Sequence, residues 1–430
     1  MHGVNQRPLP AGAVTNQPNG GLTVKTAAGH EYAVRPNGTL KTYSNGTQSV
    51  NFRSNGRVAT IHRPEIDIRR GAAGQRTIVS RRPDRSVLVS TAPHRGYLER
   101  SVVSGNRTVV QRTYVAGGRT FTRAYLGYSY AGLTLPHYVP ALYHPAEFYG
   151  WAYHGWATPV AYAWGWGEQP WYGFYGGYLT PYAAYPSGFA WLTDYVLSQT
   201  LADAYADRMQ LAQDPGAASF DDANADPNAA PPDDGLYAQA DTPITPELKD
   251  QIAGEVQHQI AYESAVVSGA AQPSVGEFPA SLQPNRVFVV ASILDVATPD
   301  QQACALTPGD VLRLDAAPPE GSGTADLLVA SSHRQDCPAG IVVTLSLLDL
   351  QEMQNSLRAQ LDAGLQTLHA SQGQGGLPAA PRSAMGAAQP SSLGAPEADP
   401  NAAALLDAQQ QDASRTETAA MQTVFPAKQQ

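Results

Sequence analysis

The 430-residue chain is poor in cysteine and in lysine, with two and four residues respectively. Residues 1–8 also lack the apolar core of a secretory signal peptide, which taken alone favours a cytoplasmic protein. The two cysteines, together with abundant tyrosine, tryptophan, asparagine and glycine, favour the opposite. We therefore expect an extracytoplasmic protein of the periplasm, the envelope or the medium, whose natural start lies upstream or has been processed.

Catalytic and cofactor-binding motifs are also missing. The sequence contains no G-x-S-x-G elbow, no phosphate-binding glycine loop and no H-E-x-x-H motif. His137, His144 and His154 are seven and ten residues apart, which fits no zinc-ligand spacing. Asp310 follows a glycine in a turn, where a carboxylate usually accepts hydrogen bonds from backbone N–H groups. We predict no catalytic, cofactor-binding or metal-binding residue, and hence no enzyme.

Lysine and arginine are absent from residues 124–207, and the charge on the two sides of this gap has opposite sign. Through Arg123, 19 basic and five acidic residues give a net charge of +14, whereas the remainder carries −23, for a total of −9. A split this large predicts either an anionic partner for the first part or attraction between the two parts of the chain.

The gap contains an aromatic stretch, residues 125–195, which holds all six tryptophans and 14 of the 21 tyrosines; its first part, 125–187, is the aromatic block. Seven prolines between positions 136 and 186 exclude one long helix. Residues 148–167 are uncharged and about long enough to cross a bilayer, but they contain His154, Pro159 and four glycines, which a membrane helix disfavours. No membrane span is therefore expected. The block is either a collapsed platform of turns and short strands, or a binding surface for sugars or peptides, because these rings have flat apolar faces and a polar edge. The candidate surface residues are Trp151, Trp156, Trp164, Trp166, Trp171 and Tyr172.

Short strands joined by tight turns are predicted before the block. Asn-Gly pairs at 37–38, 45–46 and 55–56 separate segments in which apolar residues alternate with polar ones. Asn-Gly favours two-residue hairpin turns in which both residues have positive φ. We expect an antiparallel meander of eight to ten strands with one polar face.

Arginine alternates with aromatic residues at the end of this meander. Arg112, Arg119 and Arg123 interleave with Tyr114 and Phe121. Such a face is a candidate contact for a polyanion or nucleic acid. The alternative is a solvated sheet surface whose charges prevent association with other strands. We expect weak, non-specific polyanion binding at most.

Amphipathic helices and polar linkers follow the block. Thr245, Pro246 and Glu247 have the residue types of a helix start, and leucines recur through the helix that begins at Asp349. The expected organisation is a disordered lead-in (1–21), the meander (22–124), the aromatic block (125–187), a helix (188–211), an acidic disordered linker (212–243), an amphipathic helix (245–266), a second linker (267–284), a small β domain (285–348), a helix (349–372) and a disordered tail (373–430).

The small β domain resembles two known folds through residues 306–312, Leu-Thr-Pro-Gly-Asp-Val-Leu. This turn is similar to one in bacterial Src-homology-three-like barrels and to one in PDZ domains. The barrel resemblance implies a strand at 324–335, and the PDZ resemblance implies a helix there. The leucine- and valine-rich residues 327–329 favour the barrel.

Cys304 and Cys337 are predicted to form a disulfide. Both lie beside turns at strand ends of the same small domain, where loops come together. A bond that closes a loop of about 30 residues stabilises such a thin core appreciably. The alternative is a pair of buried free thiols in a reducing compartment.

Taken together, the pattern predicts a multidomain β+α protein: a hairpin meander, an aromatic block, a small barrel with a long helix, and disordered segments. As a whole, the chain resembles exported bacterial proteins with YXWGXW-like blocks, through Tyr-Ala-Trp-Gly-Trp at 162–166. We expect a non-catalytic envelope or secreted protein that binds glycans, such as cell-wall polysaccharide, or a protein partner. A polyanion-binding protein and an enzyme are the alternatives.

Overall fold

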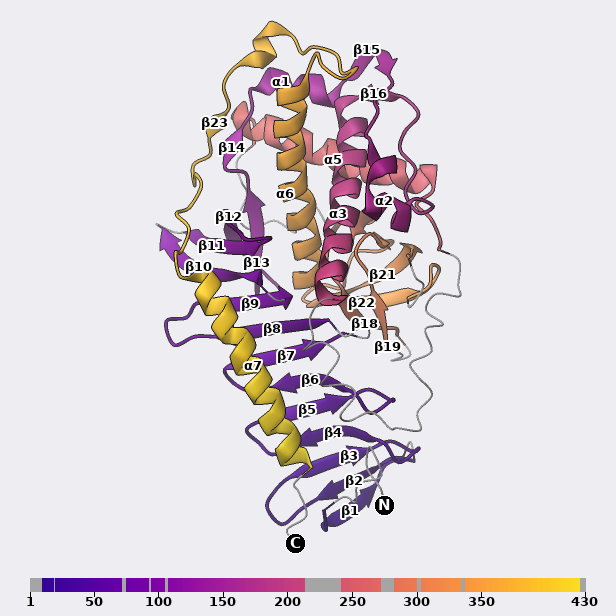
Figure 1. Cartoon of the computed structure of the whole chain (residues 1–430), viewed down its shortest axis with the longest axis vertical. Coiled ribbons are helices and arrows are strands. Elements are labelled where there is room, and N and C mark those ends of the chain that lie inside the picture. The colour runs from indigo at the N-terminus through magenta and orange to yellow at the C-terminus, as the bar shows by residue number, and fades with distance from the viewer. Residues whose placement is uncertain are drawn as a thin grey trace.

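A computed structural model describes residues 10–18, 20–71, 75–92, 94–104, 107–212, 241–271, 282–299, 303–333 and 337–425. Within these ranges the protein combines two large antiparallel sheets and two two-stranded ones with a group of helices (Figure 1). This confirms the predicted β+α class. The acidic linker lies almost entirely outside the described residues, as do residues 272–281 of the second linker and residues 1–9 and 19 of the lead-in. The described part of the lead-in is not disordered as predicted, because residues 13–16 form a strand.

The larger sheet is a meander of 13 strands in sequence order, so each strand pairs with the next. It is longer than the eight to ten strands expected, and it extends past residue 124. The strands are β1 (Ala13–Asn16), β2 (Leu22–Lys25), β3 (Glu31–Val34), β4 (Leu40–Ser44), β5 (Ser49–Phe52), β6 (Val58–His62), β7 (Ile66–Arg70), β8 (Arg76–Arg81), β9 (Val87–Ala92), β10 (Arg95–Ser104), β11 (Arg107–Ala116), β12 (Arg119–Tyr130) and β13 (Leu133–Val139).

The last hairpin extends the sheet into the aromatic block. Its turn uses Ala131 at φ 49° and Gly132 at φ 75°, which is the backbone of a two-residue hairpin loop. No Asn-Gly pair marks this turn, and for that reason the sequence pattern did not reveal it. The first part of the predicted block is therefore sheet.

The Asn-Gly turns differ from the expected type. At residues 35–39 only Gly38 has positive φ, and its N–H donates to the carbonyl of Arg35. Pro36 has the fixed φ that suits the first central position of a type I turn, and Gly38 then supplies the left-handed residue of a bulge. The side chain of Asn37 accepts a hydrogen bond from the backbone N–H of Thr39 instead of adopting positive φ itself.

One face of this sheet is apolar and is covered by α7 (Ala402–Val424), which crosses the strands diagonally in Figure 1. The sheet contributes a row of paired core residues that includes Tyr32, Tyr43 and Ile61, all about 1 % exposed or less. Residues 373–425 therefore are not part of the disordered tail predicted for 373–430, and residues 426–430 lie outside the described residues. The helix side that meets the sheet has only two larger apolar residues, Leu406 and Val424, and is otherwise small or polar: Ala402, Gln409, Ala413, Glu417 and Ala420.

The smaller sheet has six antiparallel strands in the order β17-β20-β21-β22-β18-β19. Segment 324–331 is a strand, as the barrel resemblance implies, and not the helix of the PDZ alternative. The strands are β17 (Arg286–Val289), β18 (Leu294–Ala297), β19 (Ala303–Leu306), β20 (Val311–Leu314), β21 (Thr324–Ser331) and β22 (Val342–Ser346).

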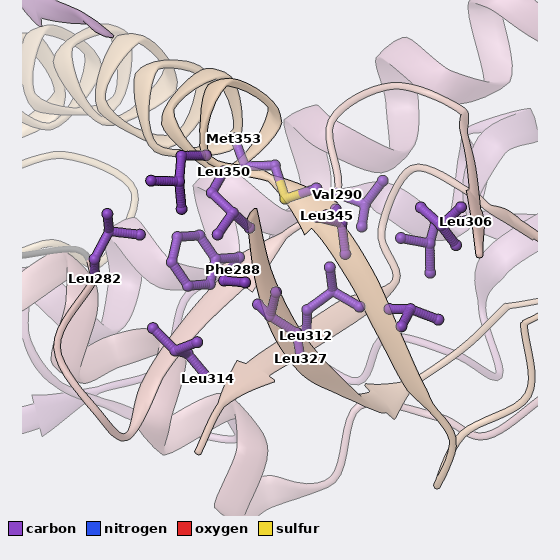
Figure 2. Close-up of a cluster of buried hydrophobic side chains, with 14 of the residues drawn as sticks. Leu282, Phe288, Val290, Leu306, Leu312, Leu314, Leu327, Leu345, Leu350 and Met353 are labelled. Atoms are coloured by element: carbon purple, nitrogen blue, oxygen red, sulfur yellow. The ribbon is translucent and has the colours of Figure 1, made fainter. Parts of the chain in front are cut away.

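The core of this small domain is closed by α6 (Leu347–Ser371). Figure 2 shows Leu350 and Met353 extending from α6 toward Phe288 and its neighbours. Ser346 caps α6 by accepting from the N–H of Asp349, so the helix begins two residues before the predicted start. Cys304 and Cys337 form the predicted disulfide, with Cα atoms 5.2 Å apart.

The remaining helices connect the two sheets. α3 (Gly188–Ala212) and α5 (Pro246–Val267) pack with α6, and Thr245 caps α5 as predicted. Short elements complete the aromatic block and the strap that leads to α7: β14 (Leu142–Tyr143), which pairs with β23 (Gln389–Pro390); α1 (Ala146–Tyr153); β15 (Gly155–Val160), which pairs with β16 (Tyr185–Ser187); and α2 (Pro170–Tyr175).

Candidate functional site

The aromatic block is organised around a stack of four rings. Trp164 stacks on Trp166 on one side and on Trp191 on the other, with centroid separations of 4.9 and 4.8 Å. Tyr195 continues the stack from Trp191 at 5.5 Å. Trp191 and Tyr195 belong to α3, whereas the other two rings come from the glycine-rich loop before α2. The stack therefore fixes an irregular loop against a regular helix.

A buried polar network anchors the same loop. The indole Nε1 of Trp164 donates to the hydroxyl of Tyr185 at 2.6 Å, and that hydroxyl donates to Asp194 at 2.6 Å. Lys249 of α5 forms an ion pair with the other carboxylate oxygen of Asp194, 2.5 Å away. Burial raises the pKa of Asp194 and lowers the pKa of Lys249, and the ion pair opposes both shifts. Because both charges are buried and paired, the network joins α3 to α5.

The structure brings the six predicted aromatic residues together mainly as core. Trp166 and Trp171 are each 8 % exposed, and the other four are half-buried. They belong to two adjoining clusters, one with Phe148 and one with Trp171. Hence the arrangement matches the collapsed platform, and these rings do not form a flat exposed surface.

The three predicted arginines lie on one face of β11 and β12, but only Arg119 is exposed. Arg112 is 4 % exposed and binds both Glu99 and Glu352, with a bidentate contact of 2.7 Å to the latter. The guanidinium of Arg123 lies 4.9 Å from the ring centre of Tyr114. Arg112 is therefore covered by α6 and already neutralised by carboxylates.

Ion pairs between the basic and acidic parts of the chain recur along the meander. They support the second reading of the charge split, in which the two parts attract each other. The pairs are Arg53–Asp295, Arg70–Glu417, Arg76–Glu417, Arg95–Asp207, Arg100–Asp399 and Arg112–Glu352.

Buried titratable groups occur, and they are dispersed; Asp310 is hydrogen-bonded, whereas neither ring nitrogen of His144 has a hydrogen-bond partner among the described residues. Asp310 accepts from the backbone N–H groups of Thr307 and His333, which is the turn-capping role expected of it. Burial raises the pKa of Asp310 to about 7 and that of Glu263, on α5, to about 7. In the described part of the chain, no three histidine, cysteine, aspartate or glutamate side chains gather as metal ligands would.

The three histidines of the aromatic block, His137, His144 and His154, make different contacts. His137 accepts a hydrogen bond from the guanidinium of buried Arg358 of α6 at 2.8 Å, and burial lowers the pKa of His137. His144 packs against His369 at a ring separation of 5.1 Å, and burial lowers the pKa of His144 to about 4. His154 is exposed beside Tyr153. Packing among aromatic rings accounts for all three.

The second face of the meander is the polar face that the sequence predicted. Through β1–β8, residues paired in register form one row across eight strands, on the face opposite the apolar core row. All members are exposed or half-exposed, and no described helix covers them. The row, here called the threonine row, consists of Thr15, Thr23, Ala33, Thr42, Asn51, Thr60, Arg69 and Thr77.

The threonine row spans about 34 Å, since neighbouring strands are about 4.8 Å apart. Asn51 donates from its side-chain amide to the hydroxyl of Thr60 at 2.7 Å, so neighbouring members already interact across strands. The alternation around the Asn-Gly turns contained this signal, because the residue next to each core position points to the opposite face. Only the register shows that these residues align in one row.

Comparison of the chain with known protein families, with curated proteins and with solved structures found no match. None of the helices in the described ranges is long and apolar enough to cross a membrane.

Proposed function

We propose that this chain is a non-catalytic, extracytoplasmic binding protein that holds cell-wall polysaccharide on the uncovered face of its meander. The threonine row is the observation that carries the proposal. It offers hydroxyl and amide groups at regular spacing on a long surface, and a polysaccharide strand repeats hydroxyl groups along its own length. Hydrogen bonds between the two, direct or through water, would give many weak contacts instead of one deep site.

The sheet is a better candidate than the aromatic block because of burial. The indole of Trp164 is held between two other rings and its N–H already has a partner. A sugar would have to displace those contacts to reach it. The threonine row, in contrast, meets solvent without any rearrangement.

The disulfide between Cys304 and Cys337 supports an extracytoplasmic location. Disulfides persist in oxidising compartments and are rare where thiols are kept reduced. The resemblance to exported bacterial proteins with YXWGXW-like blocks is in accord with this location.

A polyanion-binding function is less favoured because the arginines face carboxylates of the same chain. Arg112 is the clearest example, since Glu99 and Glu352 occupy its donors. Exposed arginines such as Arg69 and Arg81 would give weak association that falls steeply with salt. Retention on a neutral polysaccharide should instead depend little on ionic strength.

The test is retention of the full chain on insoluble cell-wall polysaccharide. The double variant Thr42→Val/Thr60→Val removes two hydroxyls from the row while keeping side-chain shape and strand preference. We expect several-fold weaker retention than for the wild type, at unchanged thermal stability. Thr120→Val, an exposed strand residue of β12 outside the row, is the matched control and should bind normally. Equal retention of the double variant and the wild type would exclude the row as the binding surface.

A further inference from the structure

The two edge strands of the 13-stranded sheet, β13 and β1, differ in whether other described residues bond to their outer backbone groups. At the β13 edge, Asn355 of α6 accepts from the backbone N–H of Tyr138 at 2.9 Å and donates to the carbonyl of Pro136 at 2.7 Å. Pro136 has no N–H of its own. Another strand therefore cannot add to this edge without displacing α6.

The β1 edge has no comparable protection among the described residues. β1 pairs with β2 alone, and its four residues are all exposed. Natural sheets usually protect such an edge with lysine, proline or a bulge within the strand. The sequence of β1, Ala-Val-Thr-Asn, has none of these, and its register with β2 is regular.

Val14 gives a second, independent observation. It is 49 % exposed, yet it lies on the apolar face of the sheet, directly paired with Val24, which is 3 % exposed. The row of core residues thus continues onto the edge strand, where its last member, Val14, is exposed to solvent. A strand added beside β1 would shield Val14 as its neighbours in the row are shielded.

The direction of the free backbone groups follows from the pairing. Gln17 donates its backbone N–H to the carbonyl of Gly21. Because every second residue of an antiparallel strand bonds to the same neighbour, the N–H and C=O groups of Thr15 also point toward β2. The N–H and C=O groups of Val14 and Asn16 then point outward. An antiparallel partner strand can form hydrogen bonds with the N–H and C=O groups of both residues.

We propose that β1 pairs with β1 of a second copy of this chain in a two-fold symmetric dimer. Val14 of each copy pairs with Asn16 of the other, and the two Thr15 residues face each other at the axis. A second copy fits because the β13 edge is blocked, so growth stops at two and no open filament forms. The dimer also joins the two threonine rows end to end, although its existence does not depend on what those rows bind.

The contact between two four-residue strands is small, so the dissociation constant should be about 10–100 µM. Sedimentation equilibrium of the full chain over this range should show a monomer–dimer equilibrium. Val14→Pro removes the outward N–H and leaves the bonds to β2 intact, and it should weaken the dimer about tenfold or more. Val14→Ala, which keeps that N–H, should weaken it less.

Cross-linking locates the axis. Because the native cysteines are bonded to each other, Thr15→Cys introduces one free thiol, and mild oxidation should give a covalent dimer. Thr23→Cys is the control, since the two copies of residue 23 would be about 14 Å apart. A wild type that stays monomeric at the highest concentration, a Val14→Pro variant that dimerises as well as the wild type, or equal cross-linking of both cysteine variants would each overturn the proposal.

Discussion

Arg70 on β7 and Glu417 on α7 form a buried ion pair across 347 residues of sequence, with Nε donating to the carboxylate at 2.9 Å. Arg76 binds the second oxygen of the same carboxylate at 3.0 Å. One glutamate near the end of the chain thus fixes α7 on the sheet and neutralises two arginines of the meander.

We expect Glu417→Ala to lower the free energy of unfolding by about 3–5 kcal/mol, because the buried Arg70 would lose its partner. Urea unfolding of the full chain measures this. Asp412→Ala on the same helix is the matched control, since Asp412 and its partner Arg415 are 65 % and 72 % exposed. The free energy of unfolding of this control should fall by about 1 kcal/mol or less. Similar losses in the two variants would contradict the anchoring role.

Trp164→Ala should behave as a core substitution and lower the free energy of unfolding by about 3–5 kcal/mol. Tyr185→Phe keeps the ring stack but removes the hydroxyl that accepts a hydrogen bond from Trp164. This variant should lower the free energy of unfolding by about 1–3 kcal/mol. Near-ultraviolet circular dichroism during urea unfolding reports on both. If Trp164→Ala left stability unchanged and abolished polysaccharide retention, the aromatic block would be the binding surface after all.

Removal of the disulfide with Cys304→Ala/Cys337→Ala should destabilise the small β domain by about 3–4 kcal/mol, because the open loop gains conformational freedom in the unfolded chain. The sequence separation is 33 residues. Limited proteolysis should cut within 285–346 first. Non-reducing peptide mapping of the wild type should recover the two cysteine peptides linked, and their recovery as free thiols would disprove the bond.

Glu263→Gln should stabilise the protein at pH 8 and have little effect at pH 5. Burial raises the pKa of Glu263 in the folded state to about 7, from about 4.5. The folded state therefore binds the proton more tightly, and stability falls as pH rises from about 4.5 to about 7. Glutamine cannot ionise, so the free energy of unfolding of the variant should exceed that of the wild type by on the order of 1–3 kcal/mol at pH 8 only.

The control for this pH effect is Glu247→Gln, an exposed glutamate in the first turn of the same helix. It should change stability little and without the same pH dependence. A Glu263→Gln effect that is equal at both pH values would show that the carboxyl is already charged, or already neutral, throughout.

Several features could be predicted because local chemistry decides them. Turn residues such as Gly38 and Gly56 and the alternation around them specified a hairpin meander, although the turn type depended on Pro36 and on bulges. Thr245 and Pro246 marked the start of α5 within one residue. The two cysteines had only each other as partners, so their placement in one small domain was sufficient to predict the bond.

The sequence alone determined the hairpin character of the meander, the helices α3, α5 and α6, and the disulfide, whereas the tertiary structure decided which surfaces are free. α7 is rich in alanine and glutamine and has few large apolar residues, and such a helix is marginal in isolation. It is stabilised by the apolar row of the meander and by partners such as Arg70. The same distant packing buries Trp164 and Arg112 and leaves the threonine row open. Burial depends on contacts between segments far apart in the sequence, and neither composition nor periodicity records them.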